Sequence, residues 1–185
     1  IPAEKWWGVC PLLIKSAFDV EQINSIEGWP TLEDTVELAC DEDAESRLIT
    51  YTEKEGFQVQ LGPFENEDVE ALVNGEEVED GLKWSLLVND VDRFLPSVSD
   101  WIDEAFEFIP HWRRDDGQIS IANEGGGIGP HVDNYDVFLI QTAGRRKWKV
   151  GTKLMPVGEE YKRLMPGLDV RVLDEPKSED DADFE

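Results

Sequence analysis

Closely spaced, short β-rich runs dominate the second half of the chain, and this pattern limits the folds that are open to it. The runs after Gly117 are Gln118–Ala122, Tyr135–Gln141, Arg146–Val150 and Leu168–Leu173. A glycine loop at Gly125–Gly129 and a turn at Thr142–Gly144 separate three of them. Short strands joined by tight turns pair as antiparallel neighbours. The second half is therefore predicted to be antiparallel β-sheet.

The first half mixes helical and strand patterns. Thr31 and Asp34 have the spacing of a capping box and predict a helix through about Ala39. Other expected elements are a short buried strand at 12–14, a hairpin of strands 46–52 and 57–61, helices at 65–73 and 97–108, and a strand at 82–88. Helices beside many short strands predict a mainly β fold with flanking α, a double-stranded β-helix of the jelly-roll or cupin kind.

Three segments are expected along the chain. Residues 1–116 supply helices and strands that lead into the barrel, and residues 117–173 form the barrel core. Residues 174–185 hold seven acids and one lysine, and they are expected to be a disordered acidic tail.

The chain is strongly acidic, with a formal net charge of -25, most of which lies outside the tail. Such a field repels phosphate backbones, so direct nucleic-acid binding is not expected, while a basic protein partner is compatible with it. Acidity that serves only solubility is the other interpretation. No apolar run is long enough to span a bilayer. A cytoplasmic or organellar protein is expected, and the first residue, Ile1, leaves the compartment open.

His131 and Asp133 are the candidate metal ligands. On a strand, residues two apart point to the same face, so an imidazole and a carboxylate can converge on one ion. With a second imidazole they would form the facial triad of non-haem Fe(II). His-x-Asp alone is a weak motif. The preceding glycine loop adds context, because its glycines permit positive φ and close backbone approach.

Arg146 is the candidate anion-binding residue. Alternation along Arg146–Val150 places Arg146 on the same face as Trp148 and Val150. A buried guanidinium needs an anion, and a carboxylate fits it in a bidentate manner. A pair with a core Asp, or a side chain that reaches solvent at the strand end, stays an alternative.

These residues carry a resemblance. The segment 125–150, GGGIGPHVDNYDVFLIQTAGRRKWKV, resembles the core of the JmjC-type cupins that hydroxylate arginine on a large-subunit ribosomal protein. Weaker likeness extends from Pro11 to Gly151. The resemblance implies that His131 and Asp133 bind Fe(II), that Arg146 anchors 2-oxoglutarate, and that the substrate is a basic ribosomal protein. It also implies a homodimer at full length.

The chain departs from the family in one respect. The family's third ligand is a downstream histidine, and the only other histidine here is His111, between Pro110 and Trp112. His111 is expected to be a surface or capping residue. The chain is therefore expected to stop before the barrel is complete and to be inactive as it stands. Four acids could steer a substrate guanidinium or be ordinary surface residues: Asp115, Asp116, Glu124 and Asp136.

The expected function is thus a 2-oxoglutarate-dependent dioxygenase that hydroxylates a protein. Two alternatives stay open. One is a cupin-like module without catalytic competence that binds a basic protein. The other is a JmjC hydroxylase or demethylase with a different protein target.

Overall fold

The computed structural model describes residues 7–76, 79–133 and 135–151, and the backbone of three short strands at 162–163, 171–172 and 182–184. The chain forms two compact units. One unit comprises Ser25–Ile128, and the other comprises Ile1–Asn24 with Gly129–Glu185. No helix in the described part of the chain is both long and apolar enough to cross a membrane.

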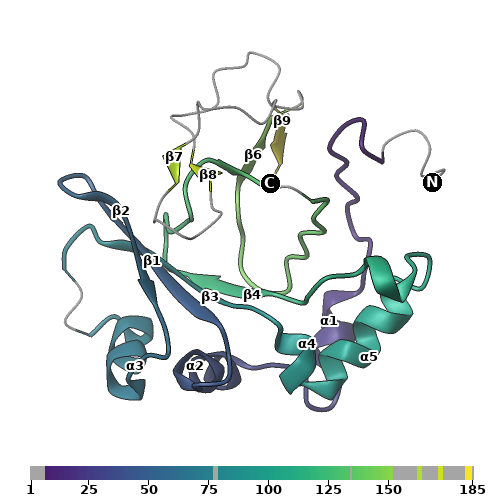
Figure 1. Cartoon of the computed structure of the whole chain (residues 1–185), viewed down its shortest axis with the longest axis horizontal. Coiled ribbons are helices and arrows are strands. Elements are labelled where there is room, and N and C mark those ends of the chain that lie inside the picture. The colour runs from purple at the N-terminus through teal and green to yellow at the C-terminus, as the bar shows by residue number, and fades with distance from the viewer. Residues whose placement is uncertain are drawn as a thin grey trace. The chain divides into compact units, whose positions relative to one another are not determined.

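The unit Ser25–Ile128 is built on a four-stranded antiparallel sheet in the order β2-β1-β3-β4 (Figure 1). Its strands are β1 (Ser46–Thr52), β2 (Gly56–Leu61), β3 (Lys83–Val88) and β4 (Ile119–Ala122). Strands β1 and β2 form a hairpin in which Tyr51 faces Phe57, with ring centroids 4.7 Å apart. Strand β3 lies between β1 and β4, and this central position explains why all but its first residue are buried.

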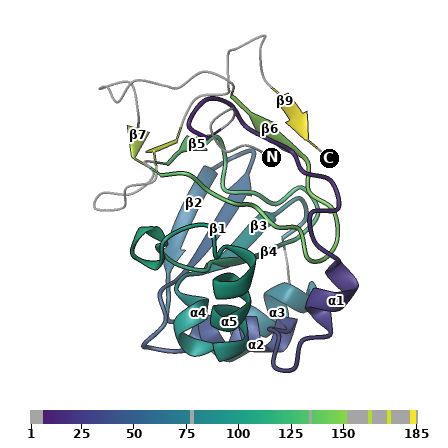
Figure 2. The ribbon, with the colours of Figure 1, turned by 90° about the vertical axis from the view of Figure 1, so that its right-hand side faces the viewer.

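Helices cover one face of this sheet (Figures 1 and 2). They are α2 (Leu32–Cys40), α3 (Asn66–Asn74), α4 (Val91–Phe94) and α5 (Pro96–Ala105). The core between sheet and helices contains Val36 and Val69 from the helices and Trp84, Leu86 and Val88 from β3. Leu86 is fully buried, and burial of a leucine side chain contributes about 1.5–3 kcal/mol.

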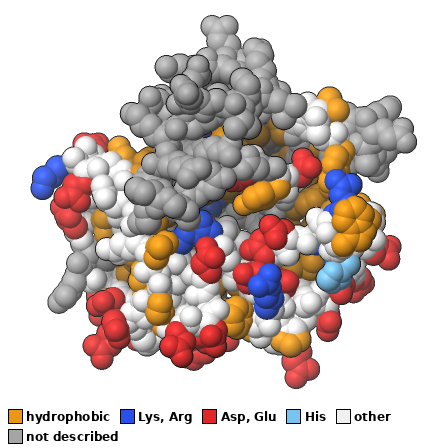
Figure 3. Space-filling model, viewed as in Figure 1, with side chains coloured by type: hydrophobic (Ala, Val, Ile, Leu, Met, Phe, Trp, Pro, Cys, Tyr) orange, Lys and Arg blue, Asp and Glu red, His pale blue; other side chains and the backbone are white. Residues whose placement is uncertain are grey.

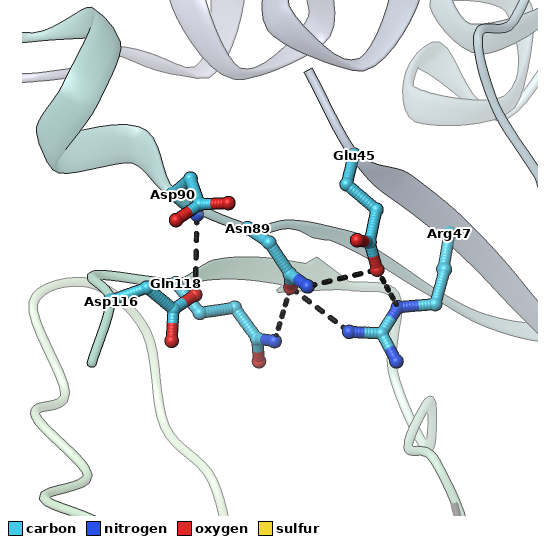
Figure 4. A network of polar contacts seen from close by, with 6 residues as sticks. All are labelled: Glu45, Arg47, Asn89, Asp90, Asp116 and Gln118. Carbon is cyan, nitrogen blue, oxygen red and sulfur yellow. Dashed lines mark hydrogen bonds and ion pairs between the residues drawn. The ribbon is translucent and has the colours of Figure 1, made fainter. Parts of the chain in front are cut away.

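A polar network joins the strand ends of this unit (Figure 4). The side-chain oxygen of Asn89, just after β3, accepts hydrogen bonds from Arg47 Nη2 at 3.0 Å and Gln118 Nε2 at 2.6 Å. The Asn89 amide donates to Glu45 Oε1 at 3.1 Å. The network therefore connects residues that flank β1, β3 and β4 and supports their register.

The other unit contains the helix α1 (Val20–Asn24) and short strands. Strands β5 (His131–Val132), β8 (Arg171–Val172) and β7 (Lys162–Arg163) form a sheet in the order β5-β8-β7. Strand β6 (Trp148–Val150) pairs antiparallel with β9 (Ala182–Phe184). A hydrogen bond from Asn24 Nδ2 to Thr142 O, 3.2 Å long, connects the end of α1 to the segment before β6.

Most expected elements of the unit Ser25–Ile128 are confirmed to within two residues. The capping box is present, since Asp34 N donates to Thr31 Oγ1 and Thr31 N donates to Asp34 Oδ2. The hairpin, the helix at 66–74 and the strands at 83–88 and 119–122 also agree. The fold class, mainly antiparallel β with flanking helices, is confirmed.

Two predicted strands are wrong. Residues 12–14 and 135–141 are not in strands, and Leu12, Ile14, Val137 and Leu139 are each at least two-fifths exposed. Both runs are apolar without the alternation that defines a strand face, and a strand exists only where a neighbour completes its hydrogen bonds.

Two further elements are shorter than predicted. The helix expected at 97–108 ends at Ala105, because Phe106 leaves the helical conformation and its ring packs against Trp101. The strand expected at 146–150 begins at Trp148, so Arg146 precedes it.

The expected division at 116 and 173 stays a prediction. Three residues of the predicted acidic tail, Ala182–Phe184, form β9, and most of the run 168–173 lies outside the described residues.

Candidate metal centre

His131 and Asp133 lie close together, as predicted. Strand β5 carries His131, and Asp133 follows its last residue. The His131 Nε2 atom is 3.6 Å from Asp133 Oδ2, and the side chains are 19% and 31% exposed. The two groups therefore lie near enough to approach one ion, with His131 half-buried and Asp133 more exposed.

The backbone orients the imidazole. His131 Nδ1 lies 2.9 Å from the carbonyl oxygen of Gly129, which can only accept, so Nδ1 carries the proton in this hydrogen bond. In the neutral ring, Nε2 then presents its lone pair toward the carboxylate of Asp133. A hydrogen bond from Nδ1 to a backbone carbonyl is the usual support of a metal-binding histidine. Two electron-pair donors that face each other in this way suit a cation bound to both.

The glycine loop before β5 uses its glycines as predicted. Gly125 and Gly129 have φ of 78° and 79°. A Cβ on Gly126 would lie 2.1 Å from the carbonyl oxygen of Trp84, so only glycine fits against β3 at this position.

Asn123 fixes the start of this loop, and the sequence interpretation missed it. Its side chain accepts from Trp84 N at 2.8 Å and donates to Leu82 O at 2.8 Å. Asn123 O also accepts from Gly126 N at 2.9 Å. An asparagine directly after a strand and before glycines is the sequence signal that could have identified it.

Arg146 is half-buried, and burial lowers its pKa from the ordinary value. Its guanidinium carbon lies 5.7 Å from the ring centroid of Trp148, so the predicted side-by-side placement of these two residues is present. Its position relative to His131 and Asp133 stays a prediction.

The other candidates lie elsewhere or already have partners. His111 begins a 3-10 helix at His111–Arg113 and is exposed, in the unit that does not contain His131. Asp115, Glu124 and Asp136 are exposed. The carboxylate of Asp116 accepts a hydrogen bond from Asp90 N at 3.2 Å, which gives it a structural contact (Figure 4).

The donor set of the pair fits Fe(II), which accepts imidazole and carboxylate ligands. Within the ranges that the structure describes, no group of three or more His, Cys, Asp or Glu side chains is placed to hold a metal ion. The described residues thus include candidates for two of the three predicted protein ligands.

Comparison with known proteins shows what the chain is similar to. Residues 102–183 match the family model of the JmjC domain, a segment that includes His131, Asp133 and Arg146. The chain is 33% identical over 170 residues to a probable ribosomal oxygenase of Haemophilus influenzae. It is 36% identical over 151 residues to the ribosomal protein uL16 3-hydroxylase of Escherichia coli. These alignments cover 92% and 82% of the chain but only 38% and 36% of the relatives, so the chain spans less than two-fifths of their length.

Solved structures give the same result. The structure of Escherichia coli YcfD matches with a TM-score of 0.72 and 34% identity, over 98% of this chain and 43% of that one. The same ribosomal oxygenase in complex with cobalt and 2-oxoglutarate matches with a TM-score of 0.63 and 33% identity, over 84% of this chain and 36% of that one.

By its matched segment the chain is similar to proteins of the JmjC class, and its fold is similar to that of a solved ribosomal oxygenase. Within that class the chain is related to the ribosomal oxygenases, as its sequence predicted.

Proposed function

We propose that the protein containing this chain is an Fe(II)- and 2-oxoglutarate-dependent hydroxylase that acts on an arginine of a large-subunit ribosomal protein. The observation that carries the proposal is the His131–Asp133 pair, with Nε2 and Oδ2 3.6 Å apart and Nδ1 held by Gly129. Relatives named ribosomal oxygenase and uL16 3-hydroxylase support the substrate class.

In this proposal each residue has one task. His131 and Asp133 hold the metal on one face, and the Gly129 carbonyl fixes the imidazole so that Nε2 faces the ion. Arg146 receives the distal carboxylate of 2-oxoglutarate, to which its guanidinium can donate two parallel hydrogen bonds. When bound, Fe(II) with 2-oxoglutarate supplies the activation of oxygen for hydroxylation of a C–H bond. A third protein ligand would come from residues outside those described.

The charge of the chain supports a basic substrate. A net charge of -25 attracts a cationic protein and repels nucleic acid, so we propose that the enzyme acts on the protein without direct contact with RNA. We also propose a homodimer, located where ribosomal proteins are made or assembled.

Mass spectrometry tests this function. The protein at its full natural length is incubated with Fe(II), 2-oxoglutarate and purified ribosomal proteins. The expected product is one basic protein heavier by a single oxygen on an arginine, together with an equal amount of succinate, and the Asp133→Ala variant should give neither. Turnover with oxygen on another residue type would favour a hydroxylase or demethylase with a different target. Binding of a basic protein without succinate would favour the module that lacks catalysis.

A further inference from the structure

The C-terminal end of α5 presents an exposed aromatic surface within the unit Ser25–Ile128. Trp112 is 82% exposed and Phe108 is 59% exposed. Figure 3 shows hydrophobic side chains at the surface over this end of α5, with acidic and basic side chains beside them. Large aromatic rings that remain this exposed are typical of interaction sites.

The backbone that carries this surface is held by named contacts. The ring of Phe108 packs at a tilt against Phe106, whose ring contacts Trp101, with centroids 6.1 and 6.0 Å apart. Arg114, 18% exposed, forms an ion pair with Asp103 and donates to Ile102 O at 3.3 Å. These contacts attach the segment on both sides of Trp112 to α5, so the exposure of Trp112 belongs to a fixed part of the unit.

Trp112 already binds a guanidinium. The Arg113 guanidinium carbon lies 5.9 Å from the centroid of the Trp112 ring, in a cation–π arrangement. An indole ring has two faces, and at 82% exposure this ring keeps room for a second cationic group. The chemistry of the surface therefore suits arginine more than any other side chain.

Acidic residues flank the two rings. In the sequence, Glu104 and Glu107 precede Phe108 and Asp115 follows Trp112, and all three acids are exposed. Of the two arginines in this stretch, Arg114 is paired with Asp103 and Arg113 stacks on Trp112. The stretch 104–115 thus presents two exposed rings and these three exposed acids beside the exposed Arg113, a charge balance that is complementary to a cationic peptide and not to an acidic one.

We propose that Phe108 and Trp112, with Glu104, Glu107 and Asp115, form a docking surface for an arginine-rich segment of the basic protein substrate. The residues of this Trp112 surface belong to the unit Ser25–Ile128, whereas His131 and Asp133 belong to the other unit. The identity of the partner, a basic protein substrate, rests on the proposed function. The recognition of arginine by this surface does not depend on that function.

Peptide binding tests the docking surface without any catalysis. Oligoarginine and oligolysine peptides of equal length are titrated against the full-length protein by fluorescence anisotropy, without Fe(II) and 2-oxoglutarate. The variants are Trp112→Ala, Trp112→Phe and Glu107→Lys. The matched controls are Leu61→Ala, an exposed hydrophobic residue of β2, and Glu53→Lys, an exposed acid in the β1–β2 turn.

The wild-type protein is expected to prefer oligoarginine. Trp112→Ala should weaken oligoarginine binding about three- to tenfold and remove the preference, while Trp112→Phe should keep part of both. Glu107→Lys should weaken both peptides, and the two controls should match the wild type. With a complete ribosomal protein as substrate, Trp112→Ala should raise KM and leave kcat unchanged.

Three results would overturn the inference. The first is that Trp112→Ala binds the peptides as the wild type does, and the second is that Glu107→Lys and Glu53→Lys have equal effects on binding. The third is a change of oligomeric state in Trp112→Ala, which would assign the surface to a second copy of the chain. Turnover of 2-oxoglutarate to succinate is measured separately. If the protein shows no such turnover but the peptide effects are as predicted, the proposed hydroxylase function is rejected and the docking surface is retained.

Discussion

His131 Nε2 faces Asp133 Oδ2 across 3.6 Å, while the opposite nitrogen of the same imidazole is held by the carbonyl of Gly129. The distance is too long for a direct hydrogen bond, and in the neutral imidazole with its proton on Nδ1 the Nε2 atom is an acceptor. We propose that a cation bound by both groups accounts for the short distance between these two electron-pair donors. The strand, the glycine loop before it and the donor atoms of the two groups therefore all support the proposed metal centre.

The glycine loop provides a matched pair of substitutions. Gly126→Ala should lower the free energy of unfolding by about 1–3 kcal/mol, because its Cβ would collide with the Trp84 carbonyl. Gly127→Ala should change it by less than about 0.5 kcal/mol, since nothing lies within 4 Å of the added carbon. Urea unfolding measures both. Equal losses in the two variants would show that the contact with β3 is not the reason for glycine at 126.

The centre of the core is Leu86, which has no exposed surface. Leu86→Ala should lower the free energy of unfolding by about 2–5 kcal/mol, because it removes buried methyl groups and leaves a cavity between the sheet and its helices. Leu61→Ala is the control, at 53% exposure, and should stay within about 0.5 kcal/mol of the wild type. A loss below 1 kcal/mol for Leu86→Ala, on the order expected for surface sites, would contradict the packing described for β3.

Asp34 gives the helix cap a pH dependence. Hydrogen bonds from the side chain and backbone of Thr31 lower the pKa of Asp34 from its ordinary value of 3.8. Because the folded-state pKa is depressed, the stabilising effect is complete above pH 3.8 and is lost as the pH falls through the folded-state pKa. Asp34→Asn should therefore be less stable than the wild type at neutral pH, by less than about 1 kcal/mol because solvent screens this partly exposed group, and equal to it in strong acid.

The control for this cap is Glu33→Gln, in the same helical turn without a bond to Thr31 in the capping box. Thermal unfolding across the acidic range measures the stability difference between each variant and the wild type. For Glu33→Gln this difference should not shrink as the pH falls, as it should for Asp34→Asn. A pH-independent difference between Asp34→Asn and the wild type would show that the charge of Asp34 plays no part.

Arg146 is predicted to set the affinity for 2-oxoglutarate. Arg146→Ala should raise the KM for 2-oxoglutarate about ten- to hundredfold, the range for a lost charged hydrogen bond. Arg146→Lys should recover part of this loss, because it keeps the charge but not the bidentate geometry. Arg145, its exposed neighbour, provides the control, and Arg145→Ala should leave KM unchanged. Initial rates at varied 2-oxoglutarate concentration decide between the two residues.

The sequence predicted what local chemistry determines. The Thr31–Asp34 capping box, the β1–β2 hairpin and the convergence of His131 and Asp133 all depend on residues a few positions apart, and all are present. The runs at 12–14 and 135–141 were mistaken for strands because a strand is completed by a distant neighbour, which a local apolar run does not reveal.

The helix α5 shows a second limit. Its apolar spacing continues to Phe108, but the helix ends at Ala105, where Phe106 turns into contact with Trp101. Asn123 was missed for a similar reason, since its value lies in contacts with Trp84 and Leu82, 39 and 41 residues earlier. Tertiary contacts of this kind override local patterns and cannot be read from them.

The central claim is tested most directly by measuring metal affinity after each of the two histidines is replaced in turn. Co(II), a spectroscopic substitute for Fe(II), is titrated into the full-length wild type and into the variants His131→Ala and His111→Ala, and the visible absorption of the bound ion is recorded. His111→Ala should bind as the wild type does, because His111 is an exposed residue of the other unit. His131→Ala should lose at least about 1.4 kcal/mol of binding free energy, a tenfold loss of affinity. Wild-type Co(II) binding by His131→Ala would contradict the assignment of the metal centre and, with it, the proposed hydroxylase.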